Sequence, residues 1–212
     1  MDNFIYPHQF HFIKLQTKTM VSARSNSTDA DVIHAVKEMA IERINHLLPN
    51  LTTEQEDILM GIDQVKDKEN MEQYLQQIKQ HVIPFPTIND KQVQKTFPKV
   101  KKLQTPDLEQ MDRKETVYLR WYDKGSAKTY MLILKDAKLI GIQGYLESSL
   151  HKGICTICNE LGEVALFTSE KKGQMRGMYT KKGNYICKDP VICNQNITDV
   201  QPLHSFVEHL KA

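Results

Sequence analysis

The sequence predicts an α+β protein in which an N-terminal four-helix bundle precedes an α/β domain with antiparallel strands. Three observations lead to this fold class. Apolar residues recur at helical spacing through residues 1–83, and from Thr116 onward apolar and polar residues alternate. All four cysteines lie in the last third of the chain, where two close pairs indicate a compact treble-clef-like finger.

The first domain, residues 1–84, is expected to contain four amphipathic helices that pack their apolar stripes together. Thr28 is the expected N-cap of the second helix, and Thr53 with Glu56 forms a capping-box pattern at the third. The fourth helix is expected over about 67–81. The residues expected on these stripes, and so buried, are Phe10, Ile13, Thr17, Met20 and Val21 in the first helix, Val32, Val36, Met39, Ala40, Ile44, Leu47 and Leu48 in the second, Ile58, Leu59 and Ile62 in the third, and Met71, Tyr74, Leu75, Ile78 and Val82 in the fourth.

A domain boundary is predicted at Pro84-Phe85-Pro86, because proline cannot continue a helix. The second domain is therefore expected to be residues 85–212, with the finger as a lobe at 151–212. Alternating residues predict a meander of three strands joined by short turns. The elements expected in this domain are a short helix over 90–97, strands over 116–122, 129–134, 139–146 and 164–168, an extended segment at 184–186, a helical turn starting at 189–191, and a closing helix with Pro202 as its first residue.

The cysteines Cys155, Cys158, Cys187 and Cys193 follow the spacing C-x2-C-x28-C-x5-C, and no cysteine is left over. Such spacing is typical of a tetrahedral Zn²⁺ site. Two disulfides are the alternative, but the chain opens MDNFIYPHQF without an apolar signal-peptide core, and disulfides are rare in the reducing cytosol. We therefore expect one structural zinc ion in a cytoplasmic binding protein, because four protein ligands leave no open position for chemistry.

The sequence lacks the common catalytic motifs, which favours a protein that is not an enzyme. His151 is the only histidine close to the cysteines and is a weak candidate for a fifth ligand. The sequence contains neither the H-E-x-x-H pattern of metalloproteases nor a G-x-x-x-x-G-K-[ST] phosphate loop. A G-x-S-x-G nucleophile elbow is also missing, and no stretch approaches the roughly 20 apolar residues of a membrane span.

Charge is distributed unevenly along the chain, although the formal net charge is only +2. Residues 1–83 carry 8 basic and 12 acidic side chains, whereas residues 84–150 carry 12 and 8. Two groups of basic residues stand out: Lys171, Lys172, Arg176, Lys181, Lys182 and Lys188 in the finger, and Lys99, Lys101 and Lys102 before it. Such cations, which are interleaved with tyrosines in the finger, could contact RNA, could meet an acidic protein surface, or could form an ordinary solvated surface.

Several motifs together resemble the FusB-type family of elongation factor G-binding proteins, some of which confer fusidic acid resistance. The finger contributes KGICTICN at 152–159, KKGNYIC at 181–187 and CN at 193–194. Upstream, FPKVKKL at 97–103 and IYPHQ at 5–9 also look familial. The resemblance therefore covers nearly the whole chain, although the helical domain matches mainly in length and pattern.

The resemblance implies a cytoplasmic protein, expected to be monomeric, that binds elongation factor G (EF-G) through its C-terminal domain. It would promote release of EF-G from ribosomes stalled by fusidic acid, without a small-molecule substrate and without contact with a membrane. The partner-binding residues implied are Lys182, Tyr185 and Phe206, together with Ile154 at a position that is aromatic in the family. An RNA- or ribosome-binding zinc finger protein is the alternative function.

Overall fold

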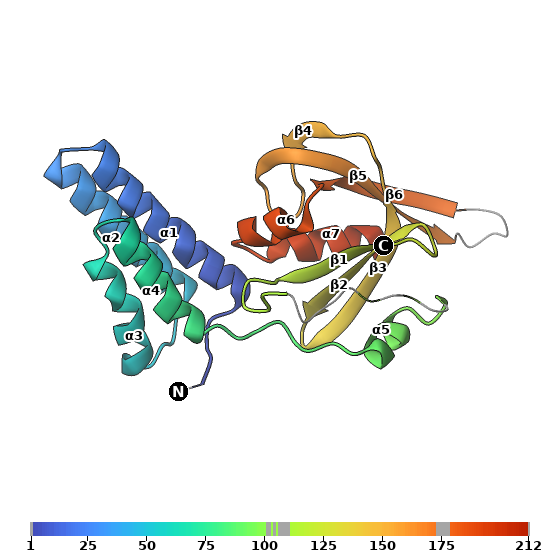
Figure 1. Ribbon diagram of the computed structural model, residues 1–212, viewed down its shortest axis with the longest axis horizontal. Coiled ribbons are helices and arrows are strands. Elements are labelled where there is room, and N and C mark those ends of the chain that lie inside the picture. Colours follow the sequence, from blue (N-terminus) through green and yellow to red (C-terminus); the bar gives the residue numbers. More distant parts are fainter. Residues whose placement is uncertain (1, 101–102, 104, 106–110, 173–178, 212) are drawn as a thin grey trace. The chain divides into compact units, whose positions relative to one another are not determined.

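The computed structural model describes all residues except 1, 101–102, 104, 106–110, 173–178 and 212 (Figure 1). The described chain forms two units, Met1–Pro84 and Phe85–Ala212. The first unit is helical, and the second contains an antiparallel sheet with helices. This arrangement confirms the predicted α+β fold class.

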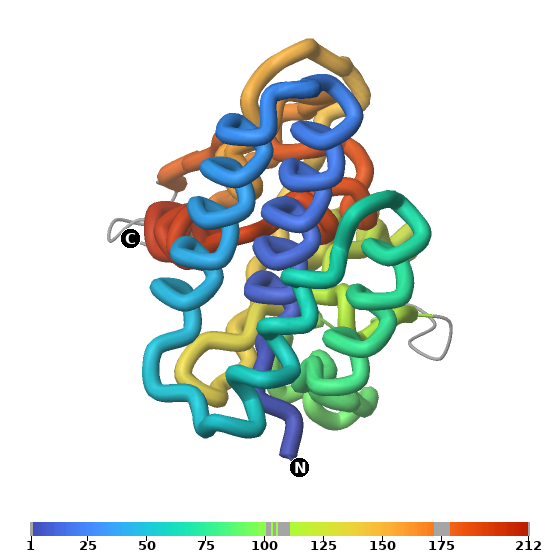
Figure 2. The backbone as a smooth tube through the Cα atoms, turned by 90° about the vertical axis from the view of Figure 1, so that its left-hand side faces the viewer, coloured from blue at the N-terminus to red at the C-terminus, as the bar shows by residue number. Residues whose placement is uncertain are grey.

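Four α-helices and one short 3₁₀ helix build the first unit. Helices α1 and α2 lie side by side, as the views in Figures 1 and 2 both show, and α4 also packs against α1. None of the described helices is both long and apolar enough to cross a membrane. The elements are α1 (Pro7–Asn26), α2 (Ala30–Leu47), α3 (Thr53–Met60), η1 (Gly61–Gln64) and α4 (Lys68–Gln80).

The predicted apolar stripes meet in one core, with one exception in α2. Val32 and Met39 were expected to be buried, but each is 47% exposed. The buried line of α2 contains Ala40 and Ile44, four residues apart. Neighbouring residues of a helix are rotated by about 100°, so Met39 lies on the flank of the line through Ala40.

Two helix starts differ from the prediction by one residue. Helix α2 is capped by Asp29, whose carboxylate accepts a hydrogen bond from the Asp31 backbone N–H at 2.9 Å, rather than by Thr28. Helix α3 is capped by Thr52, which forms a reciprocal capping box with Gln55. Asp and Thr both satisfy otherwise unpaired N–H groups at a helix start, and each start offers two such residues in a row, Thr28-Asp29 and Thr52-Thr53.

Six antiparallel strands form the sheet of the second unit in the order β1-β2-β3-β5-β4, with β6 paired to β5. The predicted three-strand meander is present, and β5 and β6 are longer than predicted. The short strand β4 was not predicted. The elements are α5 (Asp90–Thr96), β1 (Tyr118–Asp123), β2 (Lys128–Lys135), β3 (Lys138–Leu146), β4 (His151–Ile154), β5 (Leu161–Lys172), β6 (Tyr179–Cys187), α6 (Pro190–Asn196) and α7 (Gln201–Lys211).

The meander buries side chains on both of its faces. Tyr118 and Met131 belong to a core cluster that also contains the four cysteines. Leu119 and Tyr130, their neighbours in sequence, belong to a different cluster with Phe97 from the loop after α5. Alternate residues of a strand point to opposite faces, and the finger therefore shares its core with one face of the meander.

Helix α7 contributes its apolar side to that shared core. Its buried residues are the predicted ones, Leu203, Phe206, Val207 and Leu210. The helix begins at Gln201, so Pro202 is its second residue rather than its first. Proline is tolerated at either position, because the first N–H groups of a helix have no partner within it.

Candidate metal centre and partner-binding surface

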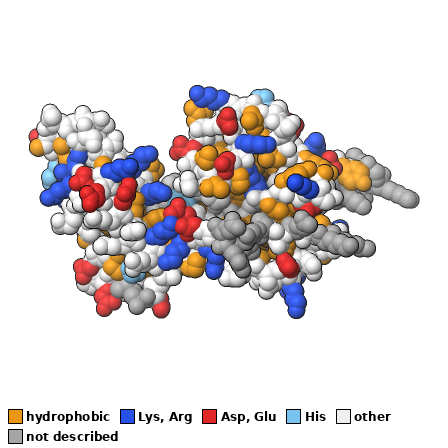
Figure 3. Space-filling view, viewed as in Figure 1, with side chains coloured by type: hydrophobic (Ala, Val, Ile, Leu, Met, Phe, Trp, Pro, Cys, Tyr) orange, Lys and Arg blue, Asp and Glu red, His pale blue; other side chains and the backbone are white. Residues whose placement is uncertain are grey.

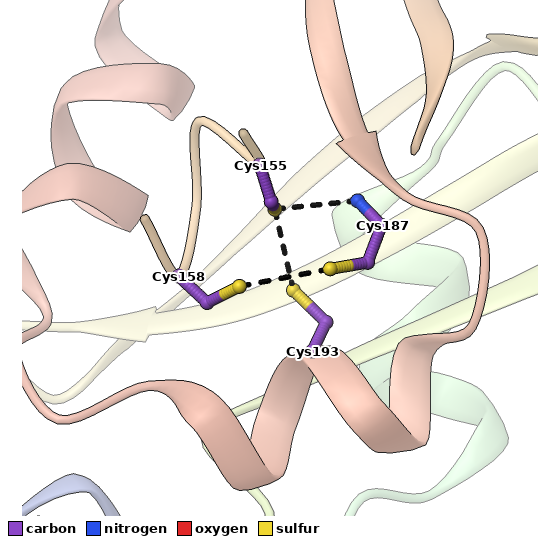
Figure 4. A group of neighbouring side chains, drawn as sticks. All are labelled: Cys155, Cys158, Cys187 and Cys193. Carbon is purple, nitrogen blue, oxygen red and sulfur yellow. Dashed lines mark hydrogen bonds between the residues drawn. The ribbon is translucent and has the colours of Figure 1, made fainter. Parts of the chain in front are cut away.

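The four cysteines converge on one point from three parts of the finger, as Figure 4 shows. Cys155 and Cys158 lie in the turn after β4, Cys187 ends β6, and Cys193 lies on α6. Asn159 follows the first pair with a φ of 59°, a left-handed conformation that asparagine tolerates. The Asn159 N–H donates to the Cys155 carbonyl at 2.9 Å. This turn directs both sulfurs of the first pair toward the second pair.

The sulfur positions suit a tetrahedral zinc ion. All four Sγ atoms lie within 4.8 Å of one another, and the four side chains are buried. The Cys155–Cys193 and Cys158–Cys187 sulfurs are 3.8 and 3.6 Å apart. Four sulfurs bound to Zn²⁺ at about 2.3 Å stand about 3.8 Å apart. His151 is exposed, stacks edge-on against Tyr185, and is not part of this group.

Hydrogen bonds among the four thiols shift their pKa values in opposite directions. Hydrogen bonds with Cys158, Cys187 and Cys193 hold the pKa of the Cys155 thiol well below its usual range. Hydrogen bonding to Cys155 conversely raises the pKa of Cys193. The backbone N–H groups of Ile157 and Cys187 point to the Cys155 sulfur at 3.4 and 3.2 Å, as they would to a thiolate. A dication would stabilise all four residues as thiolates.

Strand β1 fixes the second cysteine pair through contacts that the sequence did not reveal. The Asn194 side chain accepts from the Val117 and Tyr118 N–H groups at 2.7 and 3.1 Å and donates to the Tyr118 carbonyl at 3.1 Å. Arg120 donates to the carbonyls of Cys187 and Lys188, both at 2.7 Å. These partners are 67 to 77 residues apart in sequence, so no local pattern indicates them.

The Tyr118 hydroxyl approaches the cysteine cluster from the same strand. The hydroxyl is buried and has no hydrogen-bond partner within the described part of the chain. Burial first, and then the neighbouring Cys193 sulfur, raise the pKa of Tyr118. The hydroxyl therefore stays protonated and is placed to donate toward a Cys193 thiolate. Outer contacts of this kind hold metal ligands in position.

Two of the four predicted partner-binding residues are exposed beside the first cysteine turn. Ile154 is 66% exposed and Tyr185 is 40% exposed. The Thr156 N–H donates to the Tyr185 carbonyl at 2.9 Å, which ties the turn to β6. Leu161, paired with Ile154 across β4 and β5, is 64% exposed and was not predicted. Tyr185 pairs with Leu166, so strand alternation places its ring on the opposite face of the same sheet end. We call Ile154, Leu161 and Tyr185 the knuckle rim.

The other two predicted residues differ from Tyr185 in their placement. Lys182 pairs with Ser169 on β5, so strand alternation places it on the face that carries Ile154 and Leu161, opposite Tyr185. Phe206 is only 2% exposed and packs against Phe167, with ring centroids 6.0 Å apart. Its burial contradicts the expectation that Phe206 offers a ring at the surface.

Only some of the predicted basic side chains belong to the described part of the chain. Lys181 and Lys188 are exposed, whereas Arg176, Lys101 and Lys102 lie outside the described residues, as does the side chain of Lys172. On the face shown in Figure 3, basic and hydrophobic side chains lie next to one another over the second unit. Such a mixture is common at the surfaces that bind other proteins.

Comparisons with known proteins agree with this architecture. A family model for "Elongation factor G-binding protein, N-terminal" matches residues 4–86, and a model for "FBP C-terminal treble-clef zinc-finger" matches residues 88–210. No curated protein matches the chain. A solved structure described as "Structure of the fusidic acid resistance protein FusC" is 31% identical, with a TM-score of 0.85 over 98% of each chain. The chain therefore belongs to the FusB-type family of elongation factor G-binding proteins.

Proposed function

We propose that this protein binds EF-G through the second unit and promotes its release from the ribosome, which protects translation from fusidic acid. The observation that carries this proposal is the pair of family models, which together match residues 4–86 and 88–210. Similarity to the fusidic acid resistance protein FusC over the full chain supports it. The protein would act in the cytoplasm as a monomer, with EF-G as its direct partner and the ribosome as an indirect one.

A single zinc ion would have a structural task in this function. Cys155, Cys158, Cys187 and Cys193 would hold it, and the ion would bring charge neutralisation and rigidity to the finger. Four thiolates occupy the whole coordination sphere of zinc, which leaves no position for water or substrate. We therefore propose that the protein binds its partner without catalysing a reaction.

The knuckle rim is the contact surface that the geometry favours. Its side chains project from the turn and strands next to the cysteines, so the metal would fix their positions before the partner arrives. Tyrosine is among the residues that most often dominate binding energy, so Tyr185 is the expected hot spot of the rim. Lys182 would contribute charge on the face of the sheet that Ile154 and Leu161 share.

Release of EF-G requires the protein to distinguish two states of its partner. A ligand shifts an equilibrium only by the difference between its affinities for the two states. The rim would therefore bind the ribosome-free conformation of EF-G more tightly than the ribosome-bound one. Sedimentation of EF-G with ribosomes and fusidic acid tests this step, because addition of the protein should move EF-G to the supernatant.

The first experiment is titration calorimetry of the zinc-loaded protein against purified EF-G, and against RNA in a separate titration. We expect one-to-one binding to EF-G, and Tyr185→Ala should weaken it about tenfold or more. Tyr122→Ala is the matched control, because Tyr122 is 60% exposed on β1 and lies outside the rim. Salt-sensitive binding to RNA without binding to EF-G would favour the alternative function instead.

Phe206→Ala separates a direct contact from a packing role. Removal of a buried aromatic ring typically costs about 3–5 kcal/mol of stability, so this variant should unfold at a lower temperature than Tyr185→Ala. Thermal unfolding and calorimetry on both variants measure the difference. If Phe206→Ala kept its stability and lost EF-G binding, the ring would contact EF-G directly. The conformation that binds EF-G would then expose this ring rather than bury it.

A further inference from the structure

A second candidate site lies on the sheet of the second unit, apart from the cysteines. A hollow of about 450 Å³ opens there between residues of β2, β3, β5 and β6 and the loop after α5. Its volume is in the range of pockets that hold small ligands. The lining that concerns us is Lys99, Lys128, Lys171, Tyr145, Tyr179 and Glu170.

The hollow is basic. Among the described residues that line it, Lys171 donates to the Lys211 carbonyl at 2.9 Å, so its ammonium group lies at the end of α7 on the other face of the sheet from Tyr145. Lys99, Lys128 and Glu170 leave a net charge of +1. Residues 85–212 carry 20 basic and 14 acidic side chains, and this excess attracts anions toward the whole unit.

Aromatic rings accompany the lysines. Tyr179 is 62% exposed and Tyr145 is 43% exposed, although both rings are apolar enough to be buried in a sheet. The Lys128 ammonium lies 5.6 Å from the centroid of the Tyr145 ring. Register explains this contact, because Thr129 pairs with Gly144 and so Lys128 comes opposite Tyr145. Cation and ring thus form one surface.

Beneath the hollow, β3 and β5 pack closely. A Cβ added to Gly144 would lie 2.2 Å from the Thr168 carbonyl oxygen and 2.7 Å from the buried Phe167 ring, so the strands approach here as only glycine allows. A side chain at this position would point into the core, opposite Tyr145, and would separate the two strands.

We propose that this hollow binds a short segment of single-stranded nucleic acid. The ammonium groups of Lys99 and Lys128 would neutralise phosphates, and the rings of Tyr145 and Tyr179 would stack on bases. Lysines supply point charges without the forked geometry of arginine, which suits a flexible backbone and little sequence preference. An acidic peptide would satisfy the lysines but would leave both tyrosine rings unstacked.

The test is fluorescence anisotropy with labelled oligouridylate and oligothymidylate of about 10 nucleotides, titrated with the full zinc-loaded chain. We expect saturable binding that weakens linearly with the logarithm of the salt concentration. Binding of both strands, or of only one of them, supports the hollow and identifies which nucleic acid it takes. No binding even at about 50 mM salt would overturn the proposal.

Matched variants locate the binding site. Tyr145→Ala should weaken binding about tenfold, as loss of a stacking platform does, whereas Tyr122→Ala should not. Lys128→Ala should reduce the salt dependence, unlike Lys138→Ala at the exposed far end of β3. Retained zinc content and near-ultraviolet circular dichroism establish that each variant is folded.

Three results would contradict the hollow as a nucleic-acid site. Equal losses in Tyr145→Ala and Tyr122→Ala would place the binding elsewhere. Competition by polyglutamate as effective as that by nucleic acid would identify an acidic protein surface instead. Loss of EF-G binding in Tyr145→Ala would make the hollow part of the EF-G contact, and we expect that affinity to be unchanged.

Discussion

The two units of this chain are stabilised in different ways. In the helical unit the core consists of apolar side chains from helices that are close in sequence, such as Ile13, Ile44 and Ile78. In the second unit the largest core cluster contains the four cysteines together with Phe167 and Phe206. Residues 1–84 contain no cysteine. The first unit relies on burial and hydrogen bonding, whereas the second would add metal binding to both.

Zinc removal should produce the largest difference between the units. Structural zinc contributes on the order of 10 kcal/mol in small domains, so a chelator should unfold the finger and leave α1–α4 protected. Hydrogen exchange followed by mass spectrometry on the full chain reads the two units separately. Cys187→Ser should reproduce the effect of the chelator. Equal loss of protection in both units would show that the helical unit also depends on the metal.

A core substitution in the helical unit should give the converse pattern. Ile44 is 1% exposed, and Ile44→Ala should cost about 2–5 kcal/mol. Val32→Ala, at a site that is 47% exposed on the same helix, should change stability by less than about 0.5 kcal/mol. Thermal unfolding measures both, and zinc content should stay unchanged. Zinc loss in Ile44→Ala would mean that the two units do not unfold independently.

Loss of the Asn194 side chain should weaken the finger by an intermediate amount. Asn194→Ala leaves the Val117 and Tyr118 N–H groups without their partner, and each unsatisfied buried group costs about 1–3 kcal/mol. Release of zinc to a coloured chelator should also become faster, because the ligand Cys193 directly precedes Asn194 on α6. Gln195→Ala, at an exposed neighbour, serves as the control. Unchanged release rates would show that β1 does not hold the ligands.

The exposed Lys135–Glu208 pair should have the smallest effect. Its hydrogen bond lowers the pKa of Glu208, and a lowered folded-state pKa adds stability above the unfolded-state pKa. That contribution is lost as the pH falls through the acidic range. Glu208→Gln should therefore lower the melting temperature slightly near neutral pH and not at all below the carboxyl pKa. A shift larger at acidic than at neutral pH would reverse this sign.

Local patterns account for what the sequence predicted correctly. Helical spacing located Phe10, Ile13 and Ile78 in the core, and close cysteine spacing located the sulfur cluster. The prediction of core residues depends on the spacing of residues a few positions apart, and the prediction of the sulfur cluster depends on the chemistry of zinc ligands. Register also decides exposure, and spacing alone did not reveal that Leu161 pairs with Ile154. The exposed apolar rim was therefore predicted only in part.

Long-range packing accounts for what the sequence did not predict. The burial of Phe206 depends on its contact with Phe167, and the contacts of Asn194 and Arg120 join β1 to residues far along the chain. The family resemblance suggested that Phe206 and Lys182 share a surface with Tyr185. Strand alternation places Lys182 on the face opposite Tyr185. Core burial removes Phe206 from the surface, as the apolar stripe of its helix indicates.

The bond network of Asn194 bears on how this finger could be transplanted into another protein. Residues 151–212 include all four cysteines, yet the amide of Asn194 completes the hydrogen bonding of Val117 and Tyr118 on β1. A graft cut before residue 151 would carry every sulfur and lose the strand against which α6 is docked. The smallest segment that could be transferred intact therefore starts upstream of Val117. The meander and the finger should be moved together as one unit.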